Sequence, residues 1–326
     1  MHRRRPTILA LLTLFLAVVV SGCSSDDKSA SGDESTTTTS TTAPVPVVPA
    51  VTVTARDYGF ELPAVVEGGV IRMTLQNSGK FKHEAVIVGA GDTPVAQLTR
   101  DLTPIVQGEG KATPAYLRFH GGVSLVPGGA TAESTLTLPV GKYVLVCTLT
   151  DIDSLDSDKA AGDAEEPSAE ELQFHYERGM AAPFEVTTAN AAVMPTTDGT
   201  IVAKDWSFEL PPLAPGARTL TFRNDGQQDH SLAVAVWADG VSAEAAKAAF
   251  ETLLRADEEH PPPDGLPTPV DVAFAGPLSA GGQATFSVDL KPNRTFVFAC
   301  YLSDRSGGDL HAMGKGMVAY ATTPSG

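Results

Sequence analysis

The chain has 326 residues, enough for two ordinary domains after allowance for a leader and linkers. It carries 39 Asp and Glu against 23 Lys and Arg, and the resulting formal charge of -16 argues against nucleic-acid binding. An apolar content of 42% can build real cores, while 30 Gly, 24 Pro and 6% aromatics favour many short elements over a long helical bundle. Three Cys are too few for a disulfide-framed scaffold, so each Cys needs its own explanation.

The N-terminal segment has the pattern of a secretory leader. Arg3, Arg4 and Arg5 precede an apolar run over residues 8–20, which is shorter than the roughly 20 residues that span a bilayer. The run ends in Val-Ser-Gly-Cys23, which resembles the lipobox of bacterial lipoproteins, where the Cys becomes the lipidated first residue. We therefore expect a lipoprotein signal peptide over residues 1–22, lipidation at Cys23, and attachment to the cell membrane on its extracytoplasmic face. The alternative is an ordinary secretory leader with an incidental Cys.

Residues 23–50 are rich in Ser, Thr, Asp and Pro. This composition offers too little apolar surface to offset the entropy of ordering, so it predicts a disordered tether. Fully extended, such a tether reaches about 90 Å from the membrane.

An internal repeat organises the rest of the chain. Residues 55–63 (Ala-Arg-Asp-Tyr-Gly-Phe-Glu-Leu-Pro) recur at 203–211 (Ala-Lys-Asp-Trp-Ser-Phe-Glu-Leu-Pro), with six of nine positions identical. An Asn-x5-His pattern follows in each copy, and each copy later reaches a hydrophobic run that ends in Cys147 or Cys300. The predicted units are domain 1 at 51–188, a linker at 189–199 and domain 2 at 200–322.

Strand patterns dominate both copies. Ile71, Met73 and Leu75 alternate with polar residues, as in a half-buried strand, and Gly-Gly and Asn-x-Gly turns favour antiparallel sandwiches. Residues 242–256 are an exception, because their apolar spacing predicts an amphipathic helix with Ser242 as its cap. Residues 92–99 suggest a shorter, weaker counterpart in domain 1. The expected fold class is all-β, as two tandem β-sandwiches.

Each repeat contains a His after the Asn turn, a Cys at a strand end, and then a His followed closely by a Met. Two imidazoles and a thiolate with a weak axial thioether are the ligand set of blue copper, which balances the preferences of Cu(I) and Cu(II). The candidate metal ligands are His83, Cys147, His175 and Met180 in domain 1, and His230, Cys300, His311 and Met317 in domain 2.

These motifs resemble the copper loops of the cupredoxin family, plastocyanin-like proteins especially. The resemblance rests on Asn-x5-His, on the Tyr/Phe-rich strand ending in Cys, and on His175-Tyr-Glu-Arg-Gly-Met180 followed by Phe-Glu-Val. It spans nearly all of both domains. It implies two cupredoxin-like Greek-key sandwiches, with a short helix in the second, and one or two type-1 copper ions.

The chain departs from the family pattern in its loops. The second His usually follows the Cys closely, but 27 residues separate Cys147 from His175 and 10 separate Cys300 from His311, which is expected to loosen the ligand geometry. Five residues, not four, separate His311 from Met317, and this leaves Met313 as a weak rival.

Glu84 also departs from the family, because it follows the first His where Asn, Ser or Thr is common, as Ser231 does in domain 2. A carboxylate there could disturb the surroundings of the thiolate or lower the reduction potential of the site.

Several residues keep a competing interpretation. Cys147 and Cys300 could form a disulfide in an oxidising compartment. His120 and His260 have no counterpart between the copies and are expected in loops or at the surface. The acidic stretch 151–171 is best explained as a solvated loop, with a docking face for a basic redox partner as the alternative.

An enzyme is not expected. Multicopper oxidases and copper nitrite reductases need His-x-His or His-Cys motifs, but Val146 and Ala299 precede the two cysteines and no His-x-His occurs. The expected function is single-electron transfer by a lipid-anchored copper protein, through the exposed edge of His175 or His311, with a redox or copper-exchange protein as partner. Copper sequestration or delivery, and a metal-free pair of interaction domains, are the alternatives.

Overall fold

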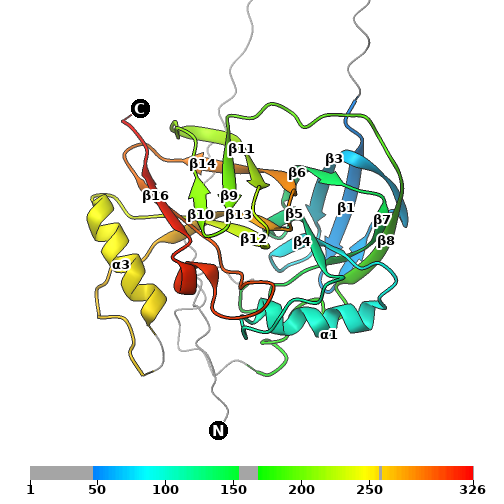
Figure 1. The fold of residues 1–326 in the computed structure, drawn as a ribbon, viewed down its shortest axis with the longest axis horizontal. Helices are drawn as coiled ribbons and strands as arrows, with labels where there is room; N and C mark the ends of the chain where they lie inside the picture. The colour runs from blue at the N-terminus through cyan, green and yellow to red at the C-terminus, as the bar shows by residue number, and fades with distance from the viewer. Residues whose placement is uncertain (1–46, 154–167, 257–258, 326) are drawn as a thin grey trace, which may run out of the picture.

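The computed structural model describes residues 47–153, 168–256 and 259–325, and within them the chain forms two β-sandwiches that lie side by side (Figure 1). The predicted all-β fold is confirmed. The expected signal peptide, Cys23, most of the tether and most of the acidic stretch lie outside the described residues. No described helix is long and apolar enough to cross a membrane.

Domain 1 is built from two packed sheets. Its elements are β1 (Ala50–Arg56), β2 (Gly59–Glu61), β3 (Val65–Asn77), β4 (His83–Gly89), α1 (Val95–Val106), β5 (Arg118–Val126), β6 (Thr131–Leu138), β7 (Gly141–Val146) and β8 (Ala181–Ala189). The long strand β3 belongs to both sheets, because it pairs with β1 and β6 over its second half and with β8 over its first. Gly68 allows this change of sheet, since a Cβ there would lie 2.4 Å from the Val186 side chain.

Domain 2 repeats this order. Its elements are β9 (Gly199–Lys204), β10 (Ser207–Glu209), β11 (Gly216–Asn224), β12 (His230–Val236), α3 (Ala243–Arg255), β13 (Val270–Leu278), β14 (Gln283–Leu290), β15 (Thr295–Ala299), a π-helical turn η1 (His311–Lys315) and β16 (Val318–Thr322). β12 lies between β13 and β15, just as β4 lies between β5 and β7.

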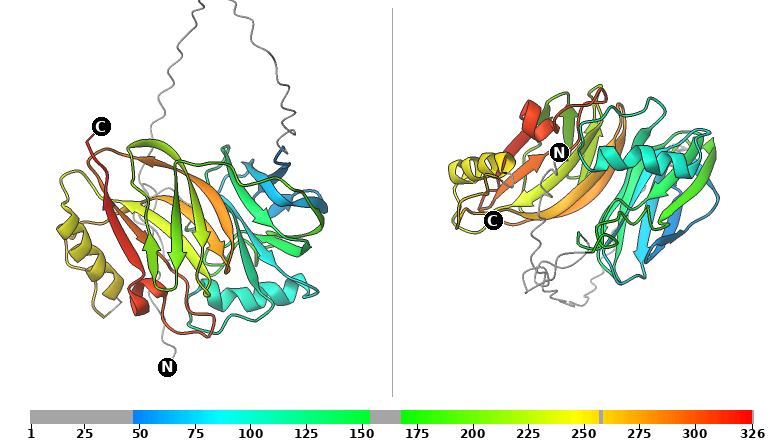
Figure 2. Two further views of the ribbon diagram at one scale, coloured as in Figure 1. Left: turned by 45° about the horizontal axis from the view of Figure 1, so that its top comes forward. Right: turned by 90° about the horizontal axis from the view of Figure 1, so that it is seen from below.

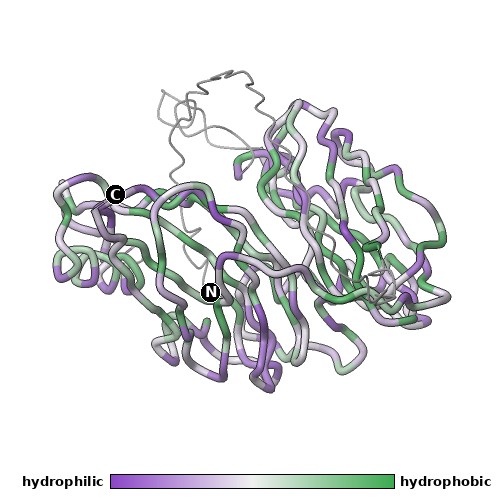
Figure 3. Tube along the Cα trace, turned by 90° about the horizontal axis from the view of Figure 1, so that it is seen from above, coloured by the Kyte–Doolittle hydropathy of each residue, from purple (hydrophilic) through white to green (hydrophobic). Residues whose placement is uncertain are grey.

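Strand alternation fills the core as predicted. Ile71, Met73 and Leu75 are at most 1% exposed, whereas Arg72 and Gln76, which alternate with them along the strand, face solvent. Each such aliphatic side chain contributes about 1.5–3 kcal/mol when it leaves water. Hydrophobic stretches run through the strands of both sandwiches, and hydrophilic stretches lie mainly at their margins (Figure 3).

The helices agree with the sequence in one domain and exceed it in the other. α3 begins after Ser242, whose Oγ accepts the backbone N–H of Ala245, as expected. In domain 1 the expectation of a weak helix over 92–99 is wrong in extent, because α1 runs to Val106. Burial of Leu98 and Leu102 stabilises α1 although Pro104 lies within its last turn.

The two domains are packed through continuous sheets. His120 of β5 pairs with Leu278 of β13, and Leu136 of β6 pairs with Ala284 of β14. The hydroxyl of Ser134 also donates to the carbonyl of Thr285 at 2.7 Å. Seen from below, the two sandwiches lie side by side, with α3 at the outer end of domain 2 and α1 nearer the middle of the molecule (Figure 2).

His120 lies at this boundary and not in a loop, so that expectation is wrong. Its ring is half-buried and meets Tyr143 edge-on, with ring centroids 5.1 Å apart. Burial, together with the nearby Arg118 guanidinium, lowers the pKa of His120 to about 4. His120 is therefore neutral in the folded protein at physiological pH.

We predict that His120→Gln makes folding less sensitive to acid. The pKa of His120 is lower in the folded protein than in the unfolded chain. As the pH falls from about 6.5 to about 4, the unfolded chain therefore binds a proton at His120 while the folded protein does not, and this stabilises the unfolded state. Between pH 7 and pH 5 the wild-type free energy of unfolding should fall by about 2 kcal/mol more than that of the variant. Denaturant unfolding at both pH values measures this difference. Substitution of the exposed His260 by Gln is the control, and parallel losses for His120→Gln and the wild type would contradict the prediction.

Candidate metal centres

A single asparagine shapes the turn before the first candidate ligand of domain 1. The Asn77 amide donates to the carbonyls of Phe81 and Val126, each at 2.8 Å, and its Oδ1 accepts the N–H of Gly79 at 2.9 Å. These bonds close the turn so that His83 begins strand β4 with its side chain inside the sandwich. The Asn of the Asn-x5-His pattern is thus structural.

Domain 2 builds the same turn. The Asn224 amide donates to the carbonyls of Gln228 at 2.7 Å and Leu278 at 2.8 Å, and Oδ1 accepts the N–H of Gly226 at 2.9 Å. His230 accordingly begins β12. The repeat therefore preserves the contacts of this turn as well as its sequence.

The structure brings the predicted His, Cys and His of domain 1 together. Nδ1 of His83 lies 3.2 Å from Nδ1 of His175, and the Cys147 sulfur lies 3.4 Å from Nδ1 of His175 and 3.9 Å from Nδ1 of His83. All three residues are 0% exposed.

The second group has the same form. The Cys300 sulfur lies 3.4 Å from Nδ1 of His311 and 3.7 Å from Nδ1 of His230, and all three side chains are again fully buried. In each domain the three ligand atoms lie within 4.8 Å of one another. Two imidazole nitrogens and one sulfur around a single point are the donor set of a trigonal copper site.

The two predicted axial residues, Met180 and Met317, are placed beside the cysteines. Both are 0% exposed, and their carbonyls accept the N–H of Cys147 and of Cys300, each at 3.3 Å. Met313 is 52% exposed, which makes it an unsuitable rival to Met317. The π-helical turn η1 takes up the extra residue between His311 and Met317.

The unequal loops do not loosen the groups, so that expectation is wrong. The N–H of His175 donates to the carbonyl of Leu149, two residues beyond Cys147, at 2.8 Å. The N–H of His311 donates in the same way to Leu302, two residues beyond Cys300, at 2.7 Å. The backbone is therefore held in the same way beside each Cys. The difference in length lies in the segment between the two residues that each of these bonds joins.

Four aspartates contact the outward nitrogens of the imidazoles, and sequence reasoning missed all four. Nε2 of His83, His175 and His311 lies 3.2, 3.1 and 3.0 Å from a carboxylate oxygen of Asp57, Asp151 and Asp304 respectively. Nε2 of His230 is 3.5 Å from a carboxylate oxygen of Asp205, which is an ion-pair distance. This Nε2 atom has no hydrogen-bond partner among the described residues. Asp57 and Asp205 occupy one position of the repeat, and this identity was the available signal.

Burial also sets the protonation of the imidazoles. It lowers the pKa of His175 and of His230 to about 4, with the neighbouring imidazole adding to the effect. Neutral imidazole is the form that binds a metal. The expected exposed edges of His175 and His311 are absent, because both residues are 0% exposed.

The two sulfurs have different neighbours. Backbone N–H groups of Glu84 and Ser231 approach Cys147 and Cys300 at 3.5 and 3.4 Å. The Ser231 hydroxyl lies 3.9 Å from the Cys300 sulfur, whereas the Glu84 carboxyl is buried and accepts the N–H and the hydroxyl of Thr148. Burial raises the pKa of both thiols and that of Glu84, and the Glu84 carboxylate raises the pKa of Cys147 further.

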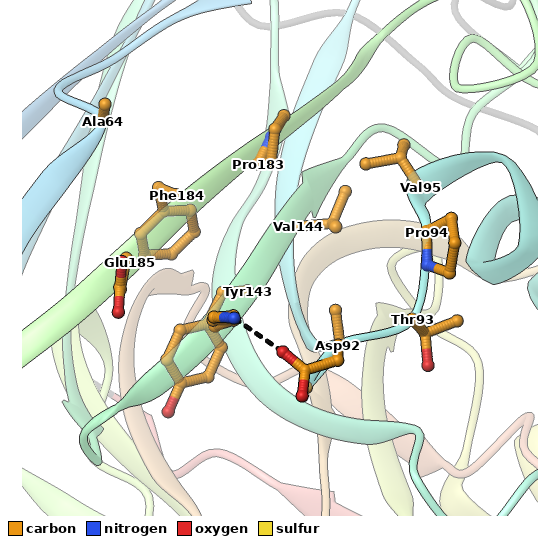
Figure 4. Close-up of a pocket in the computed structure, with 13 residues that line it drawn as sticks. Ala64, Asp92, Thr93, Pro94, Val95, Tyr143, Val144, Pro183, Phe184 and Glu185 are labelled. Carbon is orange, nitrogen blue, oxygen red and sulfur yellow. Dashed lines mark hydrogen bonds and ion pairs between the residues drawn. The ribbon is translucent and has the colours of Figure 1, made fainter.

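The competing explanation for the two cysteines, a disulfide, gains no support. Cys147 and Cys300 are free and lie in separate groups, so the disulfide alternative is wrong. Among the described residues, the two His-Cys-His groups are the only buried clusters of this kind. A surface hollow between β7, β8 and the turn before α1 contains none of these ligands, and the Lys142–Asp92 ion pair of 2.6 Å lies beside it (Figure 4).

We predict that Asn77→Ala destabilises domain 1. The change removes the bonds to Phe81 and Gly79 and leaves the buried Val126 carbonyl without its partner, so the free energy of unfolding should fall by about 2–4 kcal/mol. Chemical denaturation measures the loss. Gln76→Ala, next to it on the exposed face, should stay within about 0.5 kcal/mol of the wild type. Equal stabilities of the two variants would show that the turn does not depend on the amide.

Comparisons with known proteins find solved structures only, since no family model and no curated protein matches the sequence. Auracyanin from Roseiflexus castenholzii is 23% identical, with 40% of this chain and 98% of that chain covered and a TM-score of 0.25. Auracyanin A, a blue copper protein from Chloroflexus aurantiacus, is 18% identical, with 42% and 99% covered and a TM-score of 0.26. A copper-containing nitrite reductase from Thermus scotoductus is 13% identical, with 86% and 62% covered and a TM-score of 0.20.

TM-scores this low carry no argument, so the assignment of the two His-Cys-His groups as copper sites rests on the geometry of the chain itself. Each sandwich buries one thiol and two imidazoles whose ligand atoms face one another, and each places a buried Met beside the Cys. The resemblance to the cupredoxin family is thus confirmed in the all-β fold and in two His-Cys-His groups that fit type-1 copper.

Proposed function

We propose that the protein binds one copper ion in each domain and carries single electrons between extracytoplasmic partner proteins. The observation that carries this proposal is the closeness of three buried ligand atoms in each domain, within 4.8 Å of one another. Copper in such a donor set supplies one-electron redox chemistry.

The residues of the chain contribute a preorganised environment. The Asn turns fix the first His, the backbone anchors beside each Cys fix the second, and the aspartates orient the imidazoles with Nδ1 inward. Because these positions are set by the fold, little rearrangement is needed when the charge of the centre changes. A small rearrangement is the requirement for fast electron transfer.

Copper delivery is the competing function. A receiving protein would have to reach the metal with its own ligands, but His83, His175, His230, His311 and both cysteines are 0% exposed. Burial therefore favours retention of the ion over its release. A metal-free interaction module is disfavoured as well, because six buried polar ligands would then cost stability without a role.

The leader and Cys23 support a place for the protein outside the cytoplasm. We propose that it is lipid-anchored to the cell membrane through Cys23 and that the tether predicted over residues 23–50 lets the two sandwiches stand away from the surface.

We predict that the full chain binds two equivalents of copper with an intense blue thiolate-to-copper band. Cys147→Ser and Cys300→Ser should each remove one equivalent, since each takes the only sulfur from one His-Cys-His group. Cys23→Ser is the matched control and should leave both equivalents in place. A copper titration followed by visible spectroscopy measures the stoichiometry, and a variant that keeps both equivalents would refute its assignment.

Electron transfer and copper handling are then separated by two measurements on the loaded protein. Spectroelectrochemistry should show a reversible one-electron couple at each centre, and a Cu(I) chelator should extract copper slowly. An irreversible couple with fast extraction would favour copper handling instead.

A further inference from the structure

Both copies of the repeat hold a large aromatic residue in a backbone conformation that such residues avoid. Tyr58 has φ of 64° and Trp206 has φ of 73°, both in the left-handed region. This conformation costs about 1–3 kcal/mol and persists only where the surroundings impose it, often at functional sites. The two residues occupy the same position of the repeat, immediately after Asp57 and Asp205.

Each strained ring covers the second imidazole of its group. The Tyr58 ring meets His175 at 83°, with centroids 5.4 Å apart, and the Trp206 ring meets His311 at 80°, with centroids 5.1 Å apart. Both aromatic residues are half-buried, whereas the imidazoles are 0% exposed. The aromatic ring thus lies at the surface where the family resemblance predicted an imidazole edge.

A cation lies over each ring. The Arg178 guanidinium carbon is 3.6 Å from the centroid of Tyr58, and Nζ of Lys315 is 4.5 Å from that of Trp206. Both cations come from the segment between the second His and the Met, so the ligand loop itself supplies the cover for the ring.

In each domain one aspartate carboxylate contacts both the cation over the aromatic ring and the imidazole that the ring covers. Asp151 accepts from Arg178 at 2.6 Å, from the Tyr58 hydroxyl at 3.0 Å and lies 3.1 Å from Nε2 of His175. Asp304 lies 3.0 Å from Nε2 of His311 and 3.4 Å from Nζ of Lys315.

The residue before each ring reaches the other imidazole. Asp57 lies 3.2 Å from Nε2 of His83, and Asp205 lies 3.5 Å from Nε2 of His230. One Asp-aromatic turn therefore contacts both imidazoles of a group, which explains why the backbone accepts strain at this point.

We propose that Asp57-Tyr58 and Asp205-Trp206 are positioning residues that seal the two centres against solvent and small ligands. The aspartate holds one imidazole and the ring with its cation closes over the other. The inference rests on the proposed copper function for its purpose, but the seal is a property of the metal-free chain. A redox partner then meets the ring and the cation, and copper leaves only when the turn opens.

The two seals differ in tightness. Arg178 is 16% exposed in its side chain and is bonded to Asp151, whereas Lys315 is 40% exposed. The Tyr58 hydroxyl donates a bond to Asp151, whereas the structure describes no hydrogen bond from the Trp206 indole N–H to Asp304, whose oxygens face His311 and Lys315. The second centre should therefore open more often than the first.

The test measures thiol accessibility in the copper-free full chain. A neutral maleimide is added, and the labelling rates of Cys147 and Cys300 are followed separately by peptide mass spectrometry. In Tyr58→Ala, Cys147 should label about tenfold faster while Cys300 keeps its rate, because labelling reports local opening. Trp206→Ala should give the reverse, and the wild type should label faster at Cys300 than at Cys147.

Conservative variants separate sealing from general stability. Tyr58→Phe keeps the ring and loses only the bond to Asp151, so it should accelerate Cys147 far less than Tyr58→Ala does. Arg178→Gln removes the cation over the ring and should also accelerate Cys147 by a smaller factor than Tyr58→Ala. Equal acceleration of both cysteines in Tyr58→Ala would mean global unfolding and would overturn the inference. Unchanged labelling of Cys147 in both Tyr58→Ala and Arg178→Gln would do so too.

A second measurement uses the copper-loaded protein with azide as the small anionic probe. Azide should leave the visible spectrum of the wild type unchanged and alter the domain 1 band in Tyr58→Ala. An azide response in the wild type would show that the centre is open. Absence of copper binding would refute the proposed function but not the seal, which the labelling rates decide.

Discussion

Each sandwich buries a thiol and two imidazoles whose lone pairs face one point, and the rest of the structure follows from this constraint. Buried polar groups cost stability unless they are partnered, and here the inward atoms are kept for a metal. The outward Nε2 atoms then need other partners, and aspartate carboxylates contact them. The position of each ring must be fixed as well. Asn77 and Asn224 fix the first His of each pair through the turn that precedes it. The backbone hydrogen bonds beside Cys147 and Cys300 fix the second.

Within the described ranges, a side chain at the domain boundary supports the second centre directly. Arg305 lies in the loop between Cys300 and His311 and donates to the carbonyls of Pro114 and Leu117 in domain 1, at 3.0 and 3.1 Å. The same guanidinium pairs with Asp229, which is buried and precedes His230. In domain 1 the corresponding loop contains Asp151, which is held by Arg178 of the same domain. The second centre therefore depends on the packing of the two domains, whereas the described side chains around Asp151 tie the first centre to its own domain.

The sequence predicts the inner ligands well because their order repeats. His, Cys, His and Met recur in the same sequence twice, and strand alternation places them inside a sandwich. The outer groups were missed because their role depends on strand neighbours that a sequence does not reveal. Asp57 and Tyr58 are 26 and 117 positions before His83 and His175, which they contact. The loop lengths led to the wrong expectation of loosened ligand geometry for the same reason. The hydrogen bonds that hold each loop beside its Cys are made by the backbone, so no residue type in the sequence indicates them. His120 was misplaced because its partner strand belongs to the other domain.

Duplication has preserved the ligands and changed their surroundings. Glu84 and Ser231 occupy equivalent places next to the first His, yet one offers a buried carboxyl near the sulfur and the other a hydroxyl 3.9 Å from it. A hydroxyl that donates toward a thiolate draws electron density from the sulfur, which favours the reduced metal, whereas a carboxylate opposes reduction. The aromatic rings and cations over the second imidazoles differ between the domains as well. Domain 1 has an Arg over a hydrogen-bonded phenol, and domain 2 has a more exposed Lys over an indole. Two centres with one donor set are thus given unequal electrostatics and unequal access, and a tandem carrier needs such inequality if electrons are to move through it in one direction.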